Sequence, residues 1–324
     1  MSKIALFGDA GAIGHSIAAA LAAESRPYRV VGRDADKLRQ AFGADPLAEI
    51  VRWDPDAATS IEAAAAGVDT LVYLVGVNYW QFEQHPPLLR RTLEGAIAAG
   101  VKNFVLIGTV YSYGRPLATP LREDHPCEPH TFKGRMRKAQ EDILMAAHAA
   151  GRINATLLRL PDFYGPDVAA SLLGGAAIAA VDGGTANMIG PLDTPHEFVF
   201  VPDVGPVVAR LADTPAAFGR RWHLAGAGVV TQREMVAEME RQTGTRLKLR
   251  VTNKFMLRLL GLFNPMMREM VEMHYLQTTP VIMDDSALQA LIGPLHKTAY
   301  REGVRRMLAA QAAKRRSGET ALSR

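Results

Sequence analysis

Three glycines near the start of the chain are spaced for contact with a phosphate group. They follow the apolar run Lys3–Phe7 and open a stretch typical of a helix, Ile17–Ala23. Glycine lets the backbone turn sharply and approach a pyrophosphate closely, and the amide groups of a helix N-terminus attract its negative charge. A strand, a turn and a helix in this order predict a dinucleotide site. The predicted backbone contacts are Gly8, Gly11, Ala12, Ile13 and Gly14.

The residues after the second apolar run, Tyr28–Gly32, bear on whether the dinucleotide is NAD or NADP. Arg33 stands where a carboxylate that binds the ribose hydroxyls would favour NAD. A guanidinium can hold the 2′-phosphate of NADP with two hydrogen bonds, and Lys37 adds charge one helical turn later. NADP is therefore expected, and Asp34 keeps NAD as the alternative.

Asp54 comes directly after the third apolar run, in the sequence VRWDPD. At that place its carboxylate can accept a hydrogen bond from the adenine amino group. It can equally cap the helix that follows. Both interpretations remain open from the sequence.

The elements that position these residues alternate in type along the first half of the chain. Short apolar runs are separated by alanine-rich helical stretches, which is typical of a parallel sheet covered on both faces. We therefore predict an α/β fold with a doubly wound parallel sheet (Rossmann) and a smaller C-terminal α/β lobe that binds the substrate. The predicted strands are Lys3–Phe7, Tyr28–Gly32, Glu49–Trp53, Thr70–Val75, Asn103–Ile107 and Ala155–Leu160.

The predicted domains follow from where this alternation ends. Residues 1–160 form the dinucleotide-binding domain, residues 161–312 form mainly the substrate lobe, and about 196–210 return to the first domain. In the lobe we expect strands at His196–Val201, Arg220–Leu224 and Leu247–Val251, and a helix at Thr231–Thr243 that begins with a capping box. A methionine-rich helix, Met256–Tyr275, is expected to flank the substrate. The basic tail, residues 313–324, is predicted to be disordered.

Composition excludes several classes of protein. The 324 residues are 48% hydrophobic and carry a net charge of +4, which is typical of a globular chain. The lone Cys127 cannot form an internal disulfide, and the histidines lack metal-ligand spacing, so no metal is expected. Without an evident signal peptide or membrane-spanning run, we expect a cytoplasmic protein that binds neither nucleic acid nor membrane.

Several motifs together resemble the extended short-chain dehydrogenase/reductase superfamily, in particular the NAD-dependent epimerase/dehydratase group and its atypical members. They are the N-terminal glycine motif, VDTLVYLVG, LIGTVYSYG, RLPDFYGP, FVFVPDVG and MDDSALQALIG. At the end of the fourth predicted strand, Val75 and Gly76 are expected to contact the cofactor. A homodimer is a further expectation.

The resemblance also implies catalytic positions. The family's Ser or Thr that binds the reacting oxygen falls on Thr109, and the tyrosine and lysine of the next helix fall on Lys133 and Arg137 when Gly134 and Glu141 are aligned. Two cations one helical turn apart favour loss of the lysine's proton, so Lys133 can act as a general acid. Ser112 and Tyr111 are further catalytic candidates.

Three functions remain open from the sequence. The first is an NADP-dependent oxidoreductase of the carbonyl/alcohol reductase type, acting on a small molecule with an apolar portion. The second is a non-catalytic NAD(P)-binding sensor. The third is a nucleotide-sugar epimerase or dehydratase, from which the usual acid/base pair has been lost.

Overall fold

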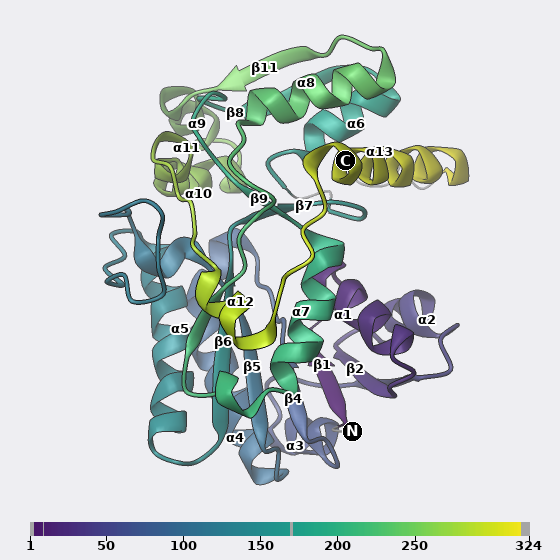
Figure 1. Ribbon diagram of the computed structural model, residues 1–324, viewed down its shortest axis with the longest axis vertical. Helices are drawn as coiled ribbons and strands as arrows, with labels where there is room; N and C mark the ends of the chain where they lie inside the picture. Colours follow the sequence, from purple (N-terminus) through teal and green to yellow (C-terminus); the bar gives the residue numbers. More distant parts are fainter. Residues whose placement is uncertain (1–2, 9, 169–170, 319–324) are drawn as a thin grey trace.

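A seven-stranded parallel sheet forms the larger part of the molecule (Figure 1), with the strand order β10-β6-β5-β4-β1-β2-β3. The computed structural model describes residues 3–8, 10–168 and 171–318. The predicted doubly wound α/β fold is confirmed. The strands are β1 (Ile4–Phe7), β2 (Tyr28–Gly32), β3 (Ala48–Arg52), β4 (Thr70–Tyr73), β5 (Asn103–Thr109), β6 (Asn154–Leu160) and β10 (Arg221–His223).

Helices cover both faces of the sheet, which explains why its central strands are apolar along almost their whole length. One face carries α1 (Ala12–Ala23), α2 (Ala35–Phe42), α7 (Val201–Ala212) and α12 (Ser286–Ile292). The other carries α3 (Ala58–Ala65), α4 (His85–Ala98) and α5 (Phe132–Ala149). Helices α1 and α7 touch so closely that a Cβ on Gly205 would lie 2.0 Å from the Ser16 carbonyl oxygen. This contact fixes the start of α1, where the glycine motif lies.

A smaller lobe sits above the carboxyl ends of the strands (Figure 1). Its apolar core contains residues of α6 (Gly174–Asp182), α8 (Gln232–Thr243) and α13 (Tyr300–Ser317), next to the parallel pair β8 (Thr185–Ile189) and β11 (Lys248–Thr252). A second pair, β7 (Asp162–Tyr164) and β9 (Phe198–Phe200), connects it to the sheet domain. The predicted capping box of α8, between Thr231 and Glu234, is confirmed.

Short helices line the junction of the sheet and the lobe. The 3-10 helices η1 (Tyr79–Gln84) and η2 (Val110–Tyr113) follow β4 and β5 there, whereas η3 (Pro215–Ala217) precedes β10 at the amino-terminal edge of the sheet. On the lobe side, α9 (Lys254–Leu260), α10 (Pro265–Met273) and α11 (Tyr275–Thr278) follow β11. Within the described part of the chain, no helix has the length and apolarity needed to cross a membrane, and no group of three metal-ligating side chains was found.

Three sequence-based expectations differ from the structure. The strand predicted at Arg220–Leu224 belongs to the large sheet, because β10 pairs with β6 rather than with a strand of the lobe. The single helix predicted at Met256–Tyr275 is divided into α9, α10 and α11. The tail from residue 313 is helical as far as Ser317, because Lys314 pairs with Asp167 and Arg315 donates to the Val181 carbonyl. Residues 319–324 lie outside the described residues.

His223 of β10 forms hydrogen bonds through both nitrogens of its ring, with partners from two distant parts of the sequence. Its Nδ1 donates to the Asp284 carbonyl at 3.0 Å, and its Nε2 accepts from the Tyr113 hydroxyl at 2.5 Å. The acceptor role of Nε2 requires the neutral ring, because both nitrogens of a protonated ring are donors. Burial, together with the nearby Arg159, lowers the pKa of His223 to about 4.

This lowered pKa predicts a loss of stability in acid. An unfolded histidine binds its proton near pH 6.5, so the stabilisation is complete above that pH and disappears as the pH falls toward 4. Between pH 7.5 and pH 5, the wild-type protein should lose about 2 kcal/mol more free energy of unfolding than His223→Asn does. Urea titrations at the two pH values measure this difference. Equal losses in the two proteins would show that His223 does not carry the effect.

Candidate active site

The glycine motif forms a close turn between β1 and α1. Gly8 has a φ of +150°, and a Cβ there would lie 2.9 Å from the Leu74 carbonyl carbon, so only glycine fits without strain. Gly11 is the N-cap of α1 and provides no side chain to bond the first turn. The orphan amide groups of that turn are therefore available to an anion. They belong to Ala12, Ile13 and Gly14, so the residues present fit a dinucleotide pyrophosphate.

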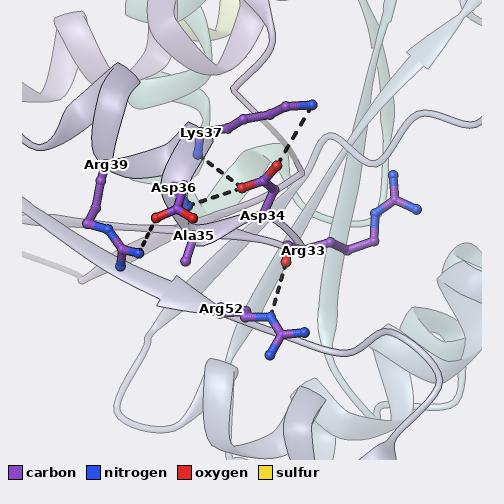
Figure 2. A pocket seen from close by; sticks show the side chains of 7 residues that line it. All are labelled: Arg33, Asp34, Ala35, Asp36, Lys37, Arg39 and Arg52. Carbon is purple, nitrogen blue, oxygen red and sulfur yellow. Dashed lines mark hydrogen bonds and ion pairs between the residues drawn. The ribbon is translucent and has the colours of Figure 1, made fainter.

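A cavity of about 640 Å³ opens beside the end of β2 (Figure 2). Figure 2 shows Arg33, Lys37 and Arg52 extending to the same side in this view, while Arg39 lies on the other side, next to Asp36. Four cations and two carboxylates line the cavity, so its balance of charge suits a phosphate. The lining residues are Arg33, Asp34, Ala35, Asp36, Lys37, Arg39 and Arg52.

The carboxylate of Asp34 already has partners within the protein. It caps α2 by accepting from the amides of Asp36 and Lys37, both at 3.1 Å, and it lies 3.9 Å from the Lys37 ammonium. Both capping bonds use Oδ1, and the other oxygen, Oδ2, is the one near Lys37. The NAD alternative that Asp34 kept open therefore remains.

The remaining predicted cofactor residues lie in loops at the same edge of the sheet. Asp54 accepts from the amide of Asp56 at 2.9 Å and closes a turn. It does not cap α3, whose N-cap Ala57 has no side-chain hydrogen bond. Val75 and Gly76 follow β4, and a Cβ on Gly76 would meet no atom within 4 Å, so the backbone there is open to a ligand.

Lys133 lies in the first turn of α5 with its side chain completely buried. Its Nζ pairs with Glu269 and with Glu272, the latter at 2.8 Å, and both carboxylates come from α10 of the lobe. The same nitrogen lies 5.6 Å from the centre of the Tyr79 ring and 5.5 Å from that of Phe82. The ammonium is thus held between two carboxylates and two aromatic rings at the junction of the sheet and the lobe.

Arg137 follows Lys133 by one helical turn, but its guanidinium is occupied by other partners. It donates to Gln140 Oε1 at 2.8 Å, to His85 Nδ1 at 3.3 Å and to the Ile107 carbonyl at 3.2 Å. Burial, with Arg137 as the second cause, lowers the pKa of His85 to about 2, so its ring stays neutral and accepts this bond. The expectation that neighbouring cations dominate the charge around Lys133 is corrected, because its ammonium pairs with two carboxylates.

Two tyrosine hydroxyls meet beside Lys133. The oxygens of Tyr79 and Tyr111 are 2.6 Å apart, and burial raises the pKa of both phenols. Both therefore remain protonated near neutral pH and can supply a proton or a hydrogen bond. Thr109 ends β5, and its Oγ accepts from the Tyr111 amide at 3.0 Å, which leaves its own hydrogen available to an oxygen in the crevice.

Ser112 is placed differently from the other catalytic candidates. It is completely buried, and its hydroxyl donates to Glu141 Oε1 at 2.6 Å. Glu141 also forms a buried ion pair with Arg159 of β6. These contacts make Ser112 part of a network that joins η2, α5 and β6.

Three groups at this junction were not among the predicted site residues. Glu269 and Glu272 were missed, although their spacing of three on one helix was visible in the sequence REMVEM. Asp162, directly after β6, accepts from His196 Nε2 at 2.8 Å. The neighbouring Glu197 is buried and accepts from the amides of Met283 and Gly226.

Comparison with known proteins identifies the family. A model described as "NAD dependent epimerase/dehydratase family" matches residues 4–225. The chain belongs to the NAD-dependent epimerase/dehydratase family. The matched residues include the glycine motif, Lys133, both tyrosines of the hydroxyl pair and β10.

Two curated members of this family show which activities occur among its relatives. The chain is 29% identical over 229 residues to a dTDP-6-deoxy-L-talose 4-dehydrogenase (NAD(P)(+)) of Kitasatospora kifunensis, which covers 66% of this chain and 71% of that protein. It is 26% identical over 168 residues to a UDP-glucose 4-epimerase of Corynebacterium glutamicum. That alignment covers 48% of this chain and 50% of the epimerase.

Solved structures of the epimerase/dehydratase family share the fold over nearly the whole chain. A UDP-glucuronic acid 4-epimerase from Bacillus cereus in complex with NAD has a TM-score of 0.80 and 16% identity, covering 96% of this chain and 99% of that one. DesIV, a dTDP-glucose 4,6-dehydratase from Streptomyces venezuelae with NAD and TYD bound, has a TM-score of 0.81 and 18% identity, covering 97% and 98%.

Proposed function

We propose that the protein is an NAD(P)-dependent oxidoreductase that interconverts a secondary alcohol and a ketone on the sugar of a nucleotide-linked substrate. The observation that carries this proposal is the buried ammonium of Lys133, placed beside Tyr79 and Tyr111 at the position where the family resemblance puts an acid/base tyrosine. Membership of the family and the similarity to a nucleotide-sugar 4-dehydrogenase support the substrate class.

The cofactor site in this proposal consists of residues that the sequence and the structure place at one edge of the sheet. The backbone amides after Gly8 hold the pyrophosphate, and the cations around Arg33 hold the adenosine end. When bound, the nicotinamide group supplies or accepts the hydride. Val75 and Gly76 border it from the end of β4.

The chain's own residues handle the proton. In reduction, the Thr109 hydroxyl orients the carbonyl oxygen by a hydrogen bond, and Lys133 Nζ gives its proton to that oxygen as the hydride reaches the carbon. The C=O double bond becomes a CH–OH group, and Lys133 regains a proton from solvent after α10 releases it. In the oxidative direction the same proton moves back from the hydroxyl to Nζ.

Steady-state assays with nucleotide-linked hexoses test this proposal. Net oxidation of NAD(P)H with a keto sugar, or its net formation with the alcohol, is the expected result. Inversion of a hydroxyl without net change in the cofactor would instead make the protein an epimerase, an activity that the similarity to a UDP-glucose 4-epimerase favours as the second candidate. Tight nucleotide binding without either reaction would overturn the proposal and favour the sensor.

A preference for NADPH over NADH belongs to the same proposal, and the cations beside β2 support it. Arg33→Asp should remove or invert this preference, because it replaces a phosphate partner with a repelling carboxylate. The expected loss in NADPH binding is about 1.5–3 kcal/mol, the value of a charge-assisted hydrogen bond. Calorimetric titration with both cofactors measures it.

Arg39→Asp is the matched control for this prediction. Arg39 lines the same cavity but pairs with Asp36 on the other side (Figure 2), so its replacement should leave the ratio of the two affinities nearly unchanged. A wild-type protein that binds NADH at least as tightly as NADPH contradicts the proposed preference.

A further inference from the structure

The segment Lys248–Arg268 concentrates positive charge. It contains five of the chain's 37 Lys and Arg residues and none of its 33 Asp and Glu residues. The segment therefore carries a net charge of +5. The five cations are Lys248, Arg250, Lys254, Arg258 and Arg268.

The same segment exposes an apolar surface. Helices α9 and α10 form a tight hairpin, in which a Cβ on Gly261 would lie 2.8 Å from the Arg268 Cα. Phe263 at the turn is 90% exposed and Leu262 is 75% exposed. Eight of the twelve exposed large apolar side chains in the described residues lie here, and we call them the apolar tip. They are Val251, Phe255, Met256, Leu259, Leu260, Leu262, Phe263 and Met266.

The hairpin stands at the outer edge of the lobe, on the opposite side from α13 (Figure 1). Of its two acidic neighbours, Glu272 pairs with Lys133, whereas Glu269 pairs with Lys133 and also lies 3.6 Å from Arg268, so four of the five cations have no carboxylate of α10 beside them. Soluble monomers rarely expose a contiguous apolar patch of this kind unless it binds something. The tip is therefore an interaction surface whose charge is positive.

The charge of the tip selects its partner. A second copy meeting it by a twofold axis would bring two sets of five cations together, which is unfavourable. An anionic lipid surface matches both the charge and the apolar side chains of the tip. Its headgroups attract Lys and Arg, and its acyl boundary accepts Phe and Leu. Helices of seven and nine residues are too short to span a bilayer but long enough to lie in its interface.

We propose that the α9–α10 hairpin docks the protein on an anionic membrane surface. The apolar tip enters the headgroup region, and the five cations contact the lipid phosphates. This peripheral association departs from the expectation, drawn from the sequence, that the protein binds no membrane. Because α10 also carries both carboxylates that hold Lys133, the docked hairpin places the junction of sheet and lobe close to the lipid.

Vesicle cosedimentation of the full chain tests the proposal. The wild-type protein should bind phosphatidylcholine vesicles that contain phosphatidylserine, and added salt should weaken this binding. Leu262→Ser with Phe263→Ser should reduce the partition coefficient at least about tenfold through loss of apolar contact. Lys254→Glu with Arg258→Glu should reduce it to a similar extent through charge.

The control pair is Leu117→Ser with Val229→Ser, which removes exposed apolar side chains away from the hairpin and should leave vesicle binding unchanged. Circular dichroism and nucleotide affinity verify that each variant is folded. Failure of the wild-type protein to bind anionic vesicles overturns the proposal. Concentration-dependent self-association that the Leu262/Phe263 variant abolishes, without vesicle binding, assigns the tip to a second copy instead.

Discussion

Lys133→Met should lower turnover by about 10²–10⁴-fold while leaving nucleotide affinity nearly unchanged. General acid catalysis typically contributes a factor of this size, and methionine matches the length of lysine but cannot donate a proton. Lys133 Nζ lies 5.6 Å from the centre of the Tyr79 ring, whose hydroxyl meets that of Tyr111. Comparison of kcat for the wild-type and variant proteins measures the effect, with calorimetry for nucleotide affinity.

Lys138→Met is the matched control for this prediction. Lys138 lies on the same helix, is partly exposed and pairs with Asp142 outside the junction, so its loss should not change kcat. Thr109→Val should also lower kcat, through loss of the orienting hydroxyl. Full activity of Lys133→Met would remove Lys133 from the mechanism and direct attention to Tyr111.

The double variant Glu269→Gln/Glu272→Gln should lower the free energy of unfolding by about 3 kcal/mol. It leaves the completely buried ammonium of Lys133 without a charged partner, and such uncompensated charges are strongly destabilising. The two carboxylates are themselves partly exposed, which reduces the effect below that of a fully buried pair. Urea unfolding at neutral pH measures the loss.

A triple variant that also carries Lys133→Met separates the ion pairs from other contacts of α10. Without the ammonium there is no charge left to compensate, so the triple variant should recover much of the lost stability. If the triple variant is as unstable as the double variant, the destabilisation comes from packing or from lost backbone contacts of Glu272. Equal stability of the double variant and the wild type contradicts the prediction directly.

The parts of the fold that local patterns determine could be predicted from the sequence. Apolar runs of strand length gave the first six strands of the sheet to within a few residues, because strands buried on both faces need apolar side chains throughout. The Thr231–Glu234 capping box was visible because its two partners are three residues apart. The edge strand β10 was assigned to the lobe, because nothing in three residues shows which sheet they join.

In the candidate site, too, local features could be predicted from the sequence, whereas contacts between distant residues could not. The glycine turn lies within one strand–helix unit, so its position between a strand and a helix could be predicted from the local sequence. Lys133, by contrast, is 136 and 139 residues away from the two glutamates that hold it. Arg137 meets His85 across 52 residues. A sequence shows which charges lie one helical turn apart, but only the packing of the lobe on the sheet decides which carboxylate reaches a buried cation.

Helix α5 depends on the lobe for the hydrogen bonds of its first turn. The amides of Phe132 and Lys133 donate to Glu272, at 2.9 Å and 3.3 Å, so a residue of α10 completes the start of a helix 139 or 140 residues earlier in the chain. Whenever α10 moves away, these two amide hydrogens become exposed to solvent. Their deuterium exchange rates therefore measure the fraction of time that the junction is open, without any substrate or engineered label.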